Sequence, residues 1–238
     1  MNRILKVAKW QLRDSRKAIL IFYGIVLSVV GLIALTNWLY GSGQGKAGGL
    51  DANEVVFCFV FGLNSFTTAF KFTQANNVSR RSLFIGSLLS LTSIAFLLAV
   101  ISVIFSLALR SVMPYENMVT QLYRTDAILT SLVWSFALNT FAMFLGWLIT
   151  MIYYRSNKLQ KLLVSLSPAI LVFSLVLLAR TSIGGMVFNP LIRAIRNALG
   201  FADLLNPNPH VAAFSFFVGA ACLAALNFSL IRRAPIRE

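Results

Sequence analysis

The chain has 238 residues, of which 58% are hydrophobic and only 12% are charged, and its formal net charge at pH 7 is +14. Its long apolar stretches are too numerous for one soluble core, so this composition excludes a soluble globular protein and predicts a membrane protein. The stretches are continuously apolar instead of alternating at every second residue, which excludes a transmembrane β-barrel and favours α-helices.

Residues 2–17 predict an amphipathic helix that precedes the first apolar stretch. Apolar and basic residues alternate near helical spacing, so we expect this helix to lie on the cytoplasmic membrane surface as an elbow. The apolar positions are Ile4, Leu5, Ala8 and Leu12, and the basic positions are Lys6, Lys9, Arg13 and Arg16. A cleaved signal peptide also begins with basic residues, but the stretch at 18–40 exceeds a signal-peptide core and further apolar stretches follow it.

Each apolar stretch is close to or above the length of about 20 residues that a helix needs to cross a bilayer. We therefore expect one all-α, polytopic transmembrane domain over residues 1–238, with six spans. These spans are 18–40, 55–72, 83–109, 127–154, 162–179 and 211–231. Five of them contain no charged residue, and the second carries Lys71 only at its end, where a long side chain can reach water.

The glycine-rich segment 41–54 contains the one motif that suggests nucleotide chemistry. Gly43, Gly45 and Lys46 resemble part of a phosphate-binding loop. However, Tyr40 stands where that motif needs glycine, and Ala47 stands where it needs a hydroxyl group. We therefore expect a flexible turn, and a chain that holds no cofactor and has no catalytic or metal site of its own.

The acidic residues all lie at the ends of the predicted spans or outside them. An intramembrane enzyme or a proton-coupled carrier needs ionisable groups within the membrane, so this distribution argues against both classes. Cys58 and Cys222 fall inside predicted spans, where they read as packing residues.

The basic residues concentrate before the first span, between the second and third, between the fourth and fifth, and after the sixth. The positive-inside rule places these segments, and therefore both termini, in the cytoplasm. Because the positive charge flanks spans and forms no separate basic domain, we expect anionic lipid headgroups as its partner and no nucleic acid.

Polar residues recur along one face of the second span. Asn64, Thr67, Thr68 and Lys71 follow at helical spacing, and Asn139 is a weaker case on the fourth span. A buried amide needs a hydrogen-bonding partner, so these residues predict either a helix or subunit interface or a wet substrate pathway. The pattern alone leaves both interpretations open.

The cytoplasmic connection at 74–82 is the most specific segment of the chain. It places Asn76 and Asn77 in a turn, followed by Ser79, Arg80 and Arg81 at the start of the third span. This order resembles the connection between spans two and three in membrane subunits of type-2 ABC exporters, in which a turn leads through Ser-Arg and a second basic residue. Asn77 stands where that family often has glycine, and asparagine tolerates the same left-handed backbone.

The basic elbow, the six spans and a long outer connection before the last span are also similar to that family. The resemblance implies a permease subunit in a bacterial cell membrane that moves an amphipathic or hydrophobic substrate outward by alternating access. It also implies a second membrane subunit, as homodimer or heterodimer, and two separate ATP-binding subunits that hold ATP and Mg²⁺. In that case Asn76, Asn77, Ser79, Arg80 and Arg81 would couple the bundle to the ATPase subunits. Antimicrobial peptides, lipid-like compounds and drugs are all open as substrates.

Residues 189–200 predict a second amphipathic helix, on the outer membrane surface. Asn189 and Pro190 are a capping residue and a helix-starting residue, and the apolar face that follows lies opposite Arg193 and Arg196. These two arginines oppose the inside charge bias, so we expect them to contact outer headgroups or substrate.

Two other classes of function are compatible with the sequence. An ATP-independent channel or carrier would transport solute when this chain alone is placed in vesicles. A membrane scaffold would bind partners without moving solute.

Overall fold

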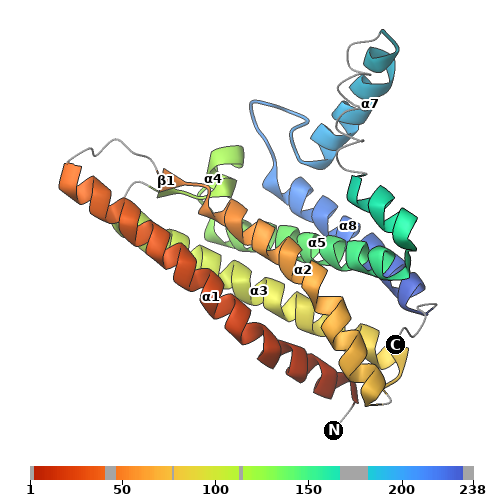
Figure 1. Ribbon diagram of the computed structural model, residues 1–238. Coiled ribbons are helices and arrows are strands. Elements are labelled where there is room, and N and C mark those ends of the chain that lie inside the picture. Colours follow the sequence, from red (N-terminus) through yellow and green to blue (C-terminus); the bar gives the residue numbers. More distant parts are fainter. Residues whose placement is uncertain (1–2, 41–46, 77, 113–114, 167–181, 233–238) are drawn as a thin grey trace.

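The computed structural model describes residues 3–40, 47–76, 78–112, 115–166 and 182–232 (Figure 1). These residues are almost entirely helical, apart from two short strands that pair in parallel, β1 (Ala47–Gly48) and β2 (Tyr115–Glu116). The helices are α1 (Arg3–Tyr40), α2 (Leu50–Ala75), α3 (Arg80–Val112), α4 (Met118–Tyr123), α5 (Ile128–Arg155), α7 (Ser182–Ala198) and α8 (Pro209–Arg232). Residues 158–166 are also helical.

Four of the described helices, α1, α3, α5 and α8, are long and apolar enough to cross a membrane. They contain the predicted spans at 18–40, 83–109 and 211–231, and α5 matches the span predicted at 127–154 to within one residue. The predicted span at 55–72 lies inside α2, which has 26 residues but is not among these four. Of the predicted span at 162–179, only residues 162–166 are described, and they are helical.

Helix α5 occupies the centre of the bundle and packs against α2, α3 and α8, whereas α1 lies at the side and packs mainly on α3 (Figure 1). The interior is filled by large side chains with almost no exposed surface, among them Phe70, Leu91, Leu98, Met143 and Trp147. A smaller cluster lies under α4, where Tyr123 and Trp134 meet edge to face. The buried residues therefore form two clusters, a large one within the bundle and a smaller one under α4.

Helices α2 and α5 approach each other through glycine. A side chain at Gly62 would collide with the backbone of Met143, and a side chain at Gly146 would collide with the backbone of Phe59. The Thr150 hydroxyl of α5 also donates a hydrogen bond to the carbonyl of Leu63 in α2. Small residues and interhelical hydrogen bonds are what bring helices together in lipid, where burial of apolar surface contributes little.

The N-terminal elbow is not a separate helix in the structure. Helix α1 runs without a break from Arg3 to Tyr40, because no proline or glycine interrupts it near residue 17. Its first turns pack against α3, where Gln11 bonds to Ser87 and Val7 lies against Gly86. Ala8 and Ser15 are also buried. The buried face of these turns includes the polar residues Gln11 and Ser15, so it differs from the apolar face that the spacing of hydrophobic residues predicts.

The outer amphipathic helix begins earlier than the sequence predicts. Helix α7 starts at Ser182 and contains Pro190 in its interior, so Asn189 and Pro190 do not cap and start it. A proline inside a helix removes one backbone hydrogen bond without necessarily ending the helix, which explains why the local start signal fails here. Figure 1 shows α7 projecting away from the bundle.

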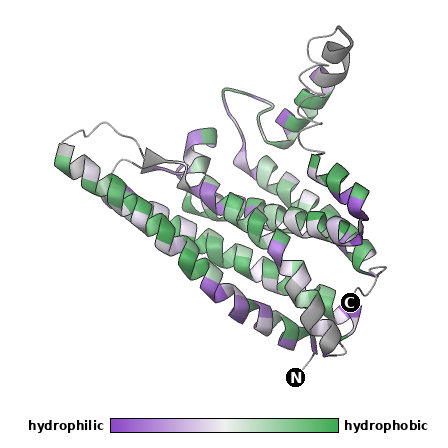
Figure 2. Cartoon of the chain, in the orientation of Figure 1, coloured by the Kyte–Doolittle hydropathy of each residue, from purple (hydrophilic) through white to green (hydrophobic). Residues whose placement is uncertain are grey.

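The outer surface of the bundle is strongly apolar. Leu20, Ile25 and Leu32 of α1 are each at least 60% exposed, and Figure 2 shows hydrophobic residues along most of that helix. A contiguous apolar surface of this kind fits a membrane environment. The chain is therefore described as a helical, membrane-embedded protein.

Candidate functional site

The connection between α2 and α3 lies at the same end of the molecule as the N-terminus and the end of α8 (Figure 1). Ser79 caps α3, because its hydroxyl accepts a hydrogen bond from the backbone N–H of Ser82 at 3.2 Å. Asn76 is an exposed turn residue, and Asn77 lies outside the described residues. The segment that the sequence singles out is thus a capped, exposed helix start.

Arg80 and Arg81 have different surroundings. The Arg80 guanidinium donates a hydrogen bond of 2.8 Å to the carbonyl of Arg232, at the end of α8. A cation is favourable at a helix C-terminus, so this contact ties the connection to the last helix. Arg81 is exposed and has no hydrogen bond or ion pair with the described residues.

A basic cavity of about 370 Å³ lies beside this connection. It is bounded by Arg3, Lys6, Val7 and Trp10 of α1 and by Thr73, Asn76 and Val78 around the end of α2. The cavity joins the first turns of α1 to the α2–α3 connection. We call this surface, together with Arg81, the coupling face. Its positive charge suits a negatively charged protein surface or lipid headgroup.

One carboxylate lies inside the bundle, and a second, half-buried one precedes it by one helical turn. Glu54 is only 5% exposed, and it accepts hydrogen bonds from the Asn139 amide at 2.6 Å and from the Tyr23 hydroxyl at 3.2 Å. Its partners come from α5 and α1, so Glu54 joins three helices. Glu54 does lie outside the predicted span at 55–72, but its side chain is buried, which its position in the chain does not indicate. Glu54 is near the start of α2, but α1 and α5 cover that start.

Asp51 holds the neighbouring end of the bundle together. Its carboxylate accepts hydrogen bonds from the backbone N–H of Met118 at 2.7 Å and from the hydroxyl groups of Ser102 and Tyr115 at 3.1 and 3.3 Å. Met118 is the first residue of α4, so Asp51 adds to the N-terminal cap that Asn117 provides. Asp51 and Glu54 are one helical turn apart just before the span at 55–72, and this spacing is the sequence signal for the pair.

The polar residues predicted along one face of the second span do not share a single environment. Asn64 is exposed and donates a hydrogen bond of 2.9 Å to the carbonyl of Val60 in its own helix, whereas Thr67 is half-buried. The side chains of Thr68 and Lys71 lie outside the described residues. Asn139 is 1% exposed and bonds to Glu54, so it belongs to the interior of this chain and not to its outer surface.

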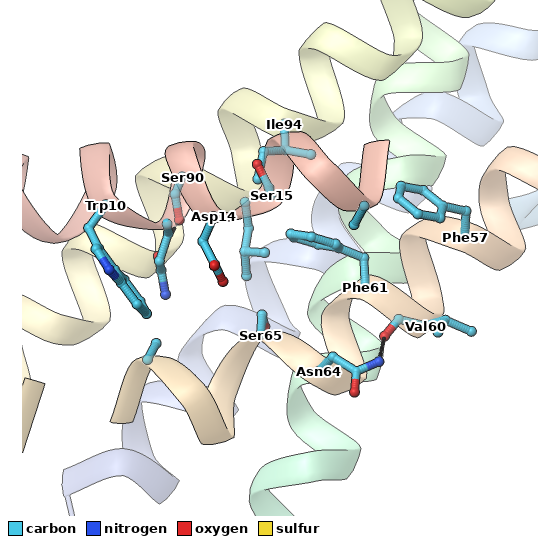
Figure 3. Close-up of a pocket in the computed structure, with 14 residues that line it drawn as sticks. Trp10, Asp14, Ser15, Phe57, Val60, Phe61, Asn64, Ser65, Ser90 and Ile94 are labelled. Carbon is cyan, nitrogen blue, oxygen red and sulfur yellow. Dashed lines mark hydrogen bonds between the residues drawn. The ribbon is translucent and has the colours of Figure 1, made fainter. Parts of the chain in front are cut away.

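A second cavity, of about 320 Å³, lies between α1, α2 and α3 (Figure 3). Asn64 lines it, together with apolar side chains that include Phe57, Phe61 and Ile94. Figure 3 shows Asp14 directed from α1 into this space. Of the described residues in the lining, only Asp14 is charged.

The remaining predicted positions lie away from these features. Arg193 is exposed on α7, and Arg196 is half-buried there. Leu191, Ile192 and Ile195 of the same helix are also exposed, so both sides of α7 are uncovered. Gly43, Gly45 and Lys46 lie outside the described residues.

Comparison with known proteins adds no identification, because no family model, curated protein or solved structure matches this chain.

Proposed function

We propose that this chain is the permease subunit of an ATP-driven exporter of the type-2 ABC class, in a bacterial cell membrane. The observation that carries the proposal is the coupling face. It combines a capped helix start, an exposed Arg81 and a basic cavity at one end of a bundle of long apolar helices. Both termini are cytoplasmic in this proposal, so the coupling face meets the cytoplasm.

Arg81 is the residue that most directly supports this proposal. A cation in the first turn of a helix opposes the helix dipole by about 0.3–1 kcal/mol, so Arg81 does not stabilise α3 locally. An exposed guanidinium there is better explained by an anionic partner outside the chain. The proposed partner is an ATPase subunit, present in two copies with its own ATP and Mg²⁺, beside a second membrane subunit.

The proposed transport mechanism depends on the contacts of the α2–α3 connection with the rest of the bundle. The two ATPase subunits would change their separation when they bind ATP, and a contact at Arg81 would pass that motion to the start of α3. Arg80 links the same turn to the end of α8, so both helices would move together. A ligand shifts such an equilibrium only through unequal affinity for its states, and here the ATPase subunit provides that difference.

The test is co-purification with the nucleotide-binding subunit encoded by an adjacent reading frame, followed by flux measurements in vesicles. Arg81→Glu should weaken ATPase association and reduce ATP-dependent flux while leaving membrane insertion unchanged. For ATPase association, Arg193→Glu is the matched control, because Arg193 is also exposed but lies on α7. Equal association for both variants and the wild-type chain would contradict the assignment of the coupling face.

A second candidate, an ATP-independent carrier, is favoured by one observation. Glu54 is a buried carboxylate held by Asn139 and Tyr23, and buried ionisable groups are the usual relays of proton-coupled carriers. This candidate predicts solute flux driven by a proton gradient when the chain alone is in vesicles, and loss of that flux in Glu54→Gln. Association with an ATPase without any flux would instead indicate a scaffold.

A further inference from the structure

The cavity between α1, α2 and α3 has a lining of mixed chemistry. Its apolar part comes from Trp10, Phe57, Val60, Phe61, Leu91 and Ile94. Its polar part includes Gln11, Ser15, Asn64, Ser65 and Ser90. Cavities of roughly 300–1,000 Å³ with apolar walls and a few convergent polar groups are the usual form of small-molecule sites. The volume of about 320 Å³ falls within that range.

The polar lining is held in place by contacts across helices. The Gln11 amide donates a hydrogen bond of 2.9 Å to the Ser87 hydroxyl, and the Ser90 hydroxyl donates to the Gln11 carbonyl oxygen. Gln11 and Ser90 are both buried, so these contacts join α1 to α3 and fix the cavity wall. The hollow is therefore bounded by rigid helices and not by loops.

Asp14 sets the charge of this cavity. It is exposed, and among the residues that the structure describes it is the one charged residue in the lining and has no hydrogen bond or ion pair. This is notable on a chain of net charge +14, and on a helix segment that also carries Arg13, Arg16 and Lys17, none of which lines the cavity. A carboxylate that has no direct ion-pair partner and lies beside aromatic rings attracts a cation, through charge and through the ring faces.

We infer that this cavity binds an amphipathic monovalent cation, with its charge near Asp14 and its apolar part against Phe57, Phe61 and Ile94. The inference deepens the proposed function, because it names the chemical class of a transported or regulatory ligand. The site itself needs only this chain, so binding can be measured without an ATPase subunit. Failure of the binding test and failure of ATPase association are therefore separate results.

The probe is radiolabelled tetraphenylphosphonium, an apolar cation, equilibrated with the purified chain in nanodiscs, with protein-free nanodiscs subtracted for partition into lipid. Its anionic isostere, tetraphenylborate, is measured in separate samples. We expect saturable binding of the cation and weaker binding of the anion. No saturable cation binding, or equal binding of the two ions, would overturn the inference.

Asp14→Asn should raise the dissociation constant of the cation about two- to fivefold, the size expected for one charge pair at an exposed carboxylate. Asp14→Glu should retain the preference for the cation. Asp203→Asn is the matched control, because it removes one exposed carboxylate far along the chain in the connection after α7 and should leave binding unchanged. Unaltered binding in Asp14→Asn, or equal loss in both variants, would contradict the role of Asp14.

A steric variant tests the cavity independently of charge. Ala18 lines the cavity and is half-buried, so Ala18→Trp should fill the space and reduce the number of binding sites for the cation. Size-exclusion elution and thermal unfolding establish that each variant is folded. Full cation binding by a folded Ala18→Trp protein would place the ligand elsewhere.

Discussion

At the scale of single residues, Glu54 has the most demanding position in the molecule. A carboxylate removed from water is costly unless its oxygens accept hydrogen bonds, and here Asn139 and Tyr23 supply them from two other helices. The three residues are mutually dependent, because removing the acid would leave a buried amide and a hydroxyl group without their acceptor. Their energetic role can be separated from any role in transport by measuring stability.

Glu54→Ala is expected to lower the free energy of unfolding by about 1–2 kcal/mol, because the buried Asn139 amide and the half-buried Tyr23 hydroxyl lose their acceptor. Thermal unfolding of the purified protein in detergent micelles measures the effect. Asn53→Ala is the matched control, since Asn53 is the preceding residue of α2 and its side chain is exposed. An equal loss in both variants would mean that the Glu54 contacts contribute little.

At the scale of secondary-structure elements, the crossing of α2 and α5 determines how the bundle is assembled. Gly62 and Gly146 let the two backbones meet, and Thr150 adds a hydrogen bond across the same interface. Glu54 and Asn139 lie on these two helices as well. A change that separates the helices would therefore also disturb the buried carboxylate.

Gly62→Ala should destabilise the protein by about 1–3 kcal/mol, because the added methyl group meets the rigid backbone of α5. Gly31→Ala provides the control, since a side chain at Gly31 would contact nothing within 4 Å. In that control, alanine should be neutral or stabilise α1 by about 0.5–1 kcal/mol. The two melting temperatures, measured side by side, should move in opposite directions or differ clearly. Similar values would contradict the close approach of α2 and α5.

At the scale of the whole molecule, the distribution of charge indicates how the protein is oriented in the membrane. The start of α1, the α2–α3 connection and the end of α8 meet at one end, and all three are basic (Figures 1 and 2). The α7–α8 connection lies at a different part of the molecule and contains Asp203. A membrane placed across the long helices would separate these two regions.

Cysteine labelling in intact cells tests this orientation. In a Cys222→Ser background, where the remaining Cys58 is buried, we expect Ala202→Cys to react with a membrane-impermeant maleimide added outside. Arg81→Cys should react only after the cells are opened. Reaction of Arg81→Cys in intact cells would reverse the orientation and remove the coupling face from the cytoplasm.

The sequence by itself determined the class of protein and the long helices, because hydrophobic length and charge position are local properties that follow from the bilayer as solvent. It also indicated the connection at 74–82 between the second and third spans, because its turn and basic residues are adjacent in the chain. Only the tertiary structure decided that α1 continues through residue 17, that Glu54 bonds Asn139, that Arg80 bonds the end of α8, and that Asp14 faces a cavity. Each of these depends on which helix faces lie together, and that choice is made by packing between residues far apart in sequence.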